Sequence, residues 1–199
     1  MAFASGPFPL VAPHGSYQAR FCTNPLAIGI PTDGEPIVLD MATGAIAYFG
    51  LIEAKAAGRS IPDNTCYDIA GKVTTSPEDA MKGAIMTFDR SYKGSALAMM
   101  VQILAGPLID VDYFDAKSTN AGNLIIAIDP EILVDGDVFK KNVSDLSAKV
   151  KQSTKLKGVD EIFLPGERGD NLTNERLASG EIEVEDNLYQ ELEKLANAV

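Results

Sequence analysis

Three short segments of this sequence place polar groups at one end of an apolar stretch. The first is PIVLDMATG, residues 36–44, in which Asp40 follows three apolar residues and precedes small ones. One interpretation is a helix cap, because the side chain of Asp40 or Thr43 can accept a hydrogen bond from a free backbone N–H. The other is a ligand site, since a strand end beside a helix N-terminus can hold an anion.

The second segment is Tyr92-Lys93-Gly94-Ser95, which opens a long apolar stretch. Lys93 supplies a positive charge, Gly94 permits close approach of the backbone, and the first N–H groups of a helix lack intrahelical partners. These features predict an anion-binding helix start. The alternative is that Lys93 is only the last solvated residue before a buried helix.

The third segment is the turn Pro165-Gly166-Glu167-Arg168, which follows the apolar run EIFL. Proline followed by glycine is typical of a tight turn. Glu167 and Arg168 could form an ion pair within a purely structural turn. The same turn, placed at the end of a predicted strand, could instead contact a ligand.

The sequence offers few groups for other chemistry. His14, the only histidine, lies in the Pro-rich loop VAPHGS, where we expect an exposed or packed side chain rather than a catalytic one. Cys22 and Cys66 have no paired spacing and predict neither a disulfide nor a zinc site. Signatures for a Rossmann site, a phosphate loop and a nucleophile elbow are absent from the sequence. We therefore assign no catalytic residue and expect no metal.

Composition narrows the class of partner. The 199 residues carry a formal net charge of -11, which argues against binding to nucleic acid or to an anionic membrane surface. Prolines interrupt the apolar residues near the N-terminus, so the pattern is unlike a secretory signal, and we expect a cytoplasmic protein.

The elements that must position these segments alternate between strands and helices. Short apolar or alternating runs predict strands over residues 25–31, 36–40, 123–130, 159–164 and 180–185. Helical patterns cover residues 43–57, 77–82, 94–105, 139–150 and a closing segment over 186–199. The pattern predicts one α/β domain over residues 1–199.

Six motifs together resemble the malate/L-lactate dehydrogenase family of the non-Rossmann type. The family also contains sulfolactate, ureidoglycolate and diketogulonate oxidoreductases and cyclic imino-acid reductases. In chain order the motifs are VAPHGS, TNPLAIGIPT, PIVLDMATG, KGSALAMMVQILAGPL, NLIIAIDP and LPGERG. The resemblance implies a three-layer α/β/α fold on a mixed sheet, distinct from the Rossmann fold.

The same resemblance implies a cofactor, either NAD or NADP, and a small 2-oxo or 2-hydroxy acid as substrate. It also implies a homodimer, because family members pair. The cofactor-contacting positions that it implies are Ser5, Asp40, Met41, Ala42, Lys93, Gly166 and Glu167.

This chain also departs from the family pattern. Members are longer, and their N-terminal part holds a proton-transferring histidine and a substrate-gripping arginine that have no counterpart here. Cys22 and Gly44 replace the family's usual glycine and serine. Two functions follow: an NAD(P)-dependent oxidoreductase of malate/lactate type, or a non-catalytic dinucleotide-binding remnant or subunit that needs a partner chain.

Overall fold

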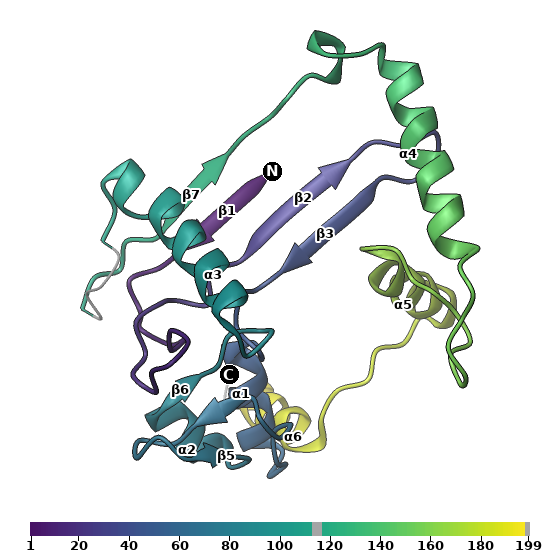
Figure 1. The fold of residues 1–199 in the computed structure, drawn as a ribbon. Helices are drawn as coiled ribbons and strands as arrows, with labels where there is room; N and C mark the ends of the chain where they lie inside the picture. Colours follow the sequence, from purple (N-terminus) through teal and green to yellow (C-terminus); the bar gives the residue numbers. More distant parts are fainter. Residues whose placement is uncertain (113–116, 198–199) are drawn as a thin grey trace. The chain divides into compact units, whose positions relative to one another are not determined.

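The computed structural model describes residues 1–112 and 117–197, which form an α/β structure (Figure 1). Its strands are β1 (Ala2–Ser5), β2 (Leu26–Ile30), β3 (Ile37–Met41), β4 (Cys66–Tyr67), β5 (Val73–Thr74), β6 (Ala84–Ile85) and β7 (Gly122–Ile125). Its α-helices are α1 (Tyr48–Ala56), α2 (Pro77–Lys82), α3 (Tyr92–Ala105), α4 (Gly136–Lys151), α5 (Glu167–Ser179) and α6 (Asp186–Ala196). Short 3-10 helices cover Pro107–Ile109 and Pro130–Ile132.

The larger sheet has four strands in the order β3-β2-β1-β7, and their arrows alternate in direction (Figure 1). The expected mixed sheet is therefore corrected to an antiparallel one. The reason is visible at β2 and β3, which are joined only by residues 31–36. A parallel pair would need a crossover connection of about a dozen residues or more.

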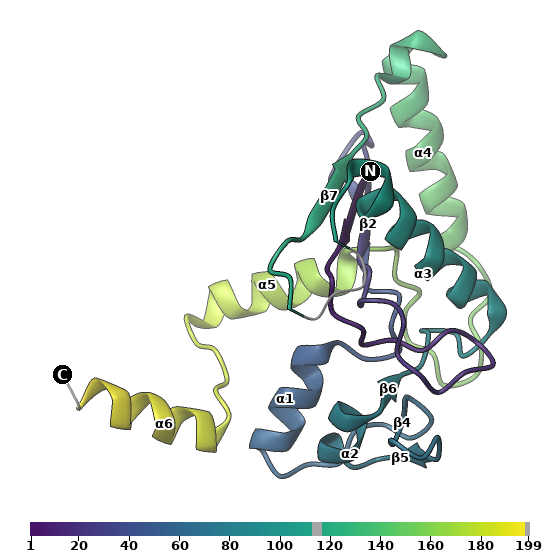
Figure 2. The same cartoon turned by 90° about the vertical axis from the view of Figure 1, so that its left-hand side faces the viewer.

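The smaller sheet has the order β5-β4-β6, and both of its strand pairs are antiparallel. Cys66 pairs with Thr74 on one side and with Ile85 on the other. Helix α1 packs against α2, and both lie beside this sheet in two views (Figures 1 and 2). A hydrophobic core forms here from the following buried residues: Val11, Leu51, Ala54, Ile61, Cys66, Ala80 and Ile85.

The backbone contacts divide the chain into two compact units. The first comprises Met1–Ala2, Ala27–Asp40 and Ile125–Ile182, so it includes α4 and α5. The second comprises Phe3–Leu26, Met41–Leu124 and Glu183–Val199, and it contains the hydrophobic core. The prediction of a single domain over residues 1–199 stays a prediction.

Helix α3 has the composition of a core helix. With the turn after it, Tyr92–Ile109 is long and apolar enough to cross a membrane by length and composition alone, a test that core helices also pass. Its buried residues recur along one face, at Gly94, Ala98, Val101, Gln102 and Ala105. This spacing of three and four residues is that of one helix side packed against protein.

Two predicted strands do not form. Residues 159–164 and 180–185 have no strand pairing among the described residues, and helix α5 occupies Glu167–Ser179 between them. Helix α5 has no buried residues, and its sequence has no apolar stripe that would have indicated a helix. Helix α2 confirms the predicted segment 77–82 with the same bounds, and α3, α4 and α6 confirm the helical segments predicted there with shifted ends. Residues 198–199 of the predicted closing helix lie outside the described residues.

Candidate functional site

The first unit contains a cavity of about 790 Å³ between the end of β3 and the start of α5. It is lined by residues 38–40, 163–166 and 168–170 and by Thr173. The lining includes two acids, Asp40 and Asp170, one cation, Arg168, and the aromatic ring of Phe163. A volume of this size is within the range of ligand pockets in proteins. Asp40 and Gly166, both predicted as cofactor contacts, therefore line one cavity.

The turn at Gly166 is held against β3. The backbone N–H of Val38 donates to the carbonyl of Pro165 at 3.3 Å. Gly166 has φ 98°, a region that disfavours side chains, and a Cβ there would lie 3.1 Å from the Val38 carbonyl oxygen. Glycine is thus required both by the backbone conformation and by the close approach to the strand.

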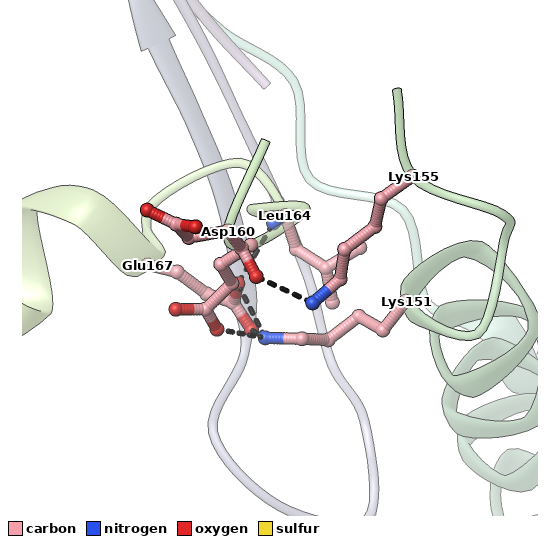
Figure 3. A network of polar contacts seen from close by, with 6 residues as sticks. Lys151, Lys155, Asp160, Leu164 and Glu167 are labelled. Carbon is pink, nitrogen blue, oxygen red and sulfur yellow. Dashed lines mark hydrogen bonds and ion pairs between the residues drawn. The ribbon is translucent and has the colours of Figure 1, made fainter. Parts of the chain in front are cut away.

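Glu167 closes this turn. Its backbone N–H donates to the Leu164 carbonyl at 3.2 Å, and its Oε2 accepts the Leu164 N–H at 2.8 Å. The Lys151 ammonium donates to both Glu167 oxygens, at 2.8 and 2.9 Å (Figure 3). These bonds, from Lys151 first, hold the pKa of the Glu167 carboxyl below its ordinary value. The ion pair expected within the turn is therefore corrected, since the partner of Glu167 is Lys151 and not Arg168.

Met41 and Ala42 continue from Asp40 into a segment that is not helical. Helix α1 begins only at Tyr48, and its N-cap Ala47 makes no side-chain bond, so the prediction of a cap at Asp40 or Thr43 is wrong. Thr43 is instead buried, and its hydroxyl is within 3.0 and 3.1 Å of the carbonyls of Thr23 and Asn24. These bonds, together with the β-bridge between Gly44 and Thr87, hold the segment in a non-helical conformation, so α1 begins only at Tyr48.

Ala42 lines a second cavity, of about 510 Å³, within the second unit. Its other lining residues are mostly apolar: Phe8, Leu10, Thr23, Ala47, Tyr48 and Phe49. Apolar walls of this kind suit a flat, weakly polar group rather than a phosphate.

The start of α3 is already occupied by a carboxylate. Asp89 accepts the N–H of Ser91 and of Gly94, each at 3.0 Å, and also the Ser91 hydroxyl. The Ser91 hydroxyl accepts the N–H of Lys93 at 3.2 Å. These N–H groups therefore have partners, which corrects the expectation that they are free for an anion. Hydrogen bonds, that of the Ser91 hydroxyl foremost, lower the pKa of Asp89 to about 2.

The structure brings the His14 loop beside the Lys93 turn. The His14 backbone N–H donates to the Ser95 hydroxyl at 3.1 Å, and the side chains of His14 and Lys93 are exposed. His14 also lines a hollow of only about 20 Å³ together with Arg90, which is room for about one water molecule. Lys93 stays available as a cation near a helix start, and its role in cofactor binding stays a prediction.

Ser5 belongs to a buried polar network. Its hydroxyl donates to Oδ1 of Asn24 at 2.8 Å, while Nδ2 of Asn24 donates to the Ala98 carbonyl and to Gln102, both at 2.9 Å. The network ties the TNP motif to α3. Contact of Ser5 with a cofactor stays a prediction, as does convergence of the three turns on one cofactor.

Sequence reasoning missed two residues at these places. The N-cap of α3 is Ser91, a residue type that signals a helix start, and Asp89 stands two positions before it. Lys151 gave no such signal, because only the folded structure brings the last residue of α4 to the first residue of α5.

Cys66 is a residue of the hydrophobic core, and burial raises the pKa of its thiol to about 11.

Residues 1–193 match the family described as malate/L-lactate dehydrogenase. An L-sulfolactate dehydrogenase from Methanothermobacter thermautotrophicus is 38% identical over 192 residues, which cover 92% of this chain and 54% of the relative. A ureidoglycolate dehydrogenase (NAD(+)) from Escherichia coli O157:H7 is 29% identical over 194 residues, covering 92% and 54%. The solved sulfolactate dehydrogenase from Methanocaldococcus jannaschii matches with a TM-score of 0.77 and 30% identity, over 99% of this chain and 58% of that one.

The chain therefore belongs to the malate/L-lactate dehydrogenase family, as its motifs predicted. It spans about half the length of the curated relatives that it matches.

Proposed function

We propose that this chain binds a nicotinamide dinucleotide, NAD or NADP, and serves hydride transfer to or from a small 2-oxo or 2-hydroxy acid. The cavity between β3 and α5 carries this proposal, because two residues predicted as cofactor contacts, Asp40 and Gly166, line it. Family membership supports the reaction class, and one relative is named for NAD(+). Malate, lactate, sulfolactate and ureidoglycolate are all 2-hydroxy acids, which supports the substrate class.

The residues present fit such a cofactor. The cavity is large enough for part of a dinucleotide, and its glycine turn lets a ligand meet the backbone closely. Asp40 would accept hydrogen bonds from hydroxyl groups, while Arg168 would supply positive charge toward phosphates. When bound, the cofactor supplies or accepts the hydride. The protein's part is to orient it and to exclude water.

A second candidate function is a dinucleotide-binding chain that needs a partner chain for turnover. The position of His14 favours it, since this sole histidine of the sequence is exposed and faces a hollow of only about 20 Å³. A general base must be held within hydrogen-bond reach of the proton that it moves.

We further propose that the fold has three layers, α/β/α, that the chain forms a homodimer, and that the protein is cytoplasmic.

The test is a fluorescence titration of the purified chain with NADH and with NADPH. We expect saturable binding of at least one dinucleotide, and little turnover of pyruvate or oxaloacetate. A His14→Ala variant separates the two candidates, because robust turnover abolished by that change would make His14 catalytic. If neither dinucleotide binds, the proposed function is wrong. Sedimentation at micromolar concentration tests the dimer.

A further inference from the structure

Lys151, the last residue of α4, and Glu167, the first residue of α5, form an ion pair beside the cavity. Lys151 ends α4, where a positive charge is favourable near the free carbonyl groups of the helix. Its ammonium lies 2.8 and 2.9 Å from the two oxygens of Glu167 (Figure 3). It also lies 3.1 Å from Oε1 of Glu161. Charge-assisted hydrogen bonds of this length are among the stronger polar contacts in proteins.

The Glu167 carboxylate, bonded to Lys151, also bonds to the backbone of the turn at residues 164–167. Oε2 accepts the Leu164 N–H at 2.8 Å, and the Leu164 carbonyl accepts the Glu167 N–H at 3.2 Å. The two residues that flank Pro165 and Gly166 are thus bonded to each other twice. A displacement of the Glu167 side chain would therefore move the turn.

Glu167 itself does not line the cavity, although Gly166 before it and Arg168 after it do. Its oxygens point to Lys151 and to the Leu164 N–H (Figure 3). The turn itself is hydrogen-bonded to β3, because the Val38 N–H donates to the Pro165 carbonyl. Lys151, Glu167 and the turn therefore form a continuous chain of contacts that ends at the cavity wall.

We propose that Lys151 is a positioning residue for the dinucleotide, acting through Glu167 to hold the turn at residues 164–167 against β3. This inference rests on the proposed function of the cavity. Glu167 then serves the cofactor by fixing the wall rather than by touching the ligand. The charged groups that face Lys151 are Glu161 and Glu167.

The decisive variants are Lys151→Met, which removes the charge, and Lys151→Arg, which can bond both carboxylate oxygens again. Lys141→Met is the matched control, because Lys141 is also a lysine of α4 but pairs with Asp145 one turn along the same helix. Each variant is titrated with NADH and NADPH by fluorescence. The exchange rate of the Leu164 amide proton is measured without cofactor, and the urea midpoint reports global stability.

We expect Lys151→Met to weaken dinucleotide binding about three- to thirtyfold, the range for residues that act without touching the ligand. Its Leu164 amide should exchange faster, Lys151→Arg should restore both properties, and Lys141→Met should resemble the wild type. Unchanged affinity and exchange in Lys151→Met would overturn the inference, as would failure of Lys151→Arg to restore them. A wild-type chain that binds neither dinucleotide would overturn the proposed function and this role with it, so the two failures are distinguishable.

Discussion

The carboxylate of Asp89 lies directly against the backbone of Gly94 at the start of α3. Oδ2 of Asp89 accepts the Gly94 N–H at 3.0 Å, and a Cβ on Gly94 would stand 2.2 Å from Oδ1. Glycine at this position therefore serves the protein's own acid, which satisfies the helix N-terminus that an external anion would otherwise use.

The first prediction concerns Gly94→Ala. The new methyl group cannot fit without displacing a carboxylate that also bonds Ser91, so the variant should lose about 1–3 kcal/mol of unfolding free energy, as overpacked sites do. Urea denaturation measures the loss. Gly169→Ala in α5 is the control, since a Cβ there meets nothing within 4 Å, and it should be neutral or slightly stabilising.

The second prediction concerns acid. The pKa of Asp89 is lowered from 3.8 to about 2 in the folded chain, so its ionised form favours folding. That contribution is complete above pH 3.8 and is lost as the pH falls toward 2. Asp89→Asn should therefore show a weaker decline of the urea midpoint than the wild type between about pH 4 and pH 2. Equal slopes for both proteins would contradict the assignment.

The sequence predicted much of the fold because its signals were local. Proline and serine marked the start of α2, and β-branched residues flanked by turns marked β2 and β3. The late start of α1 was unpredictable, since the bonds that hold Thr43 come from Thr23 and Asn24, far along the chain. Such long-range contacts override local propensity.

The candidate site divides in the same way. Asp40 and Gly166 stand out in the sequence because one interrupts an apolar run and the other follows proline, and both line the cavity. The clamp between Lys151 and Glu167 joins two helices across 16 positions, and neither residue type nor spacing indicates such a pair. Pairs of this kind are found only once the chain is folded.

The third prediction concerns the buried network around Asn24. Asn24→Ala removes the bonds to Ser5, to Gln102 and to the Ala98 carbonyl, and leaves buried polar atoms without these partners. We expect a loss of about 3 kcal/mol of unfolding free energy, because three buried hydrogen bonds are lost and the Ser5 hydroxyl, which is buried, loses its bond to Asn24. Thermal and urea unfolding measure it. Asn171→Ala, at an exposed position of α5, should change stability by less than about 0.5 kcal/mol.

The last prediction separates Lys93 from the acid that caps its helix. Ser91 and Asp89 already accept the N–H groups of Lys93 and Gly94, so we expect any attraction of a dinucleotide phosphate to this helix start to come mainly from the Lys93 ammonium. Removing a hydrogen bond to a charged group weakens binding about ten- to a hundredfold. Lys93→Ala should therefore lower the affinity for NADH or NADPH by that factor and leave the urea midpoint unchanged, because the Lys93 side chain is exposed. Lys55→Ala, an exposed lysine in the last turn of α1, is the matched control for the loss of one positive charge. If Lys93→Ala and Lys55→Ala bind both dinucleotides equally well, Lys93 is only a solvated residue at the start of a core helix.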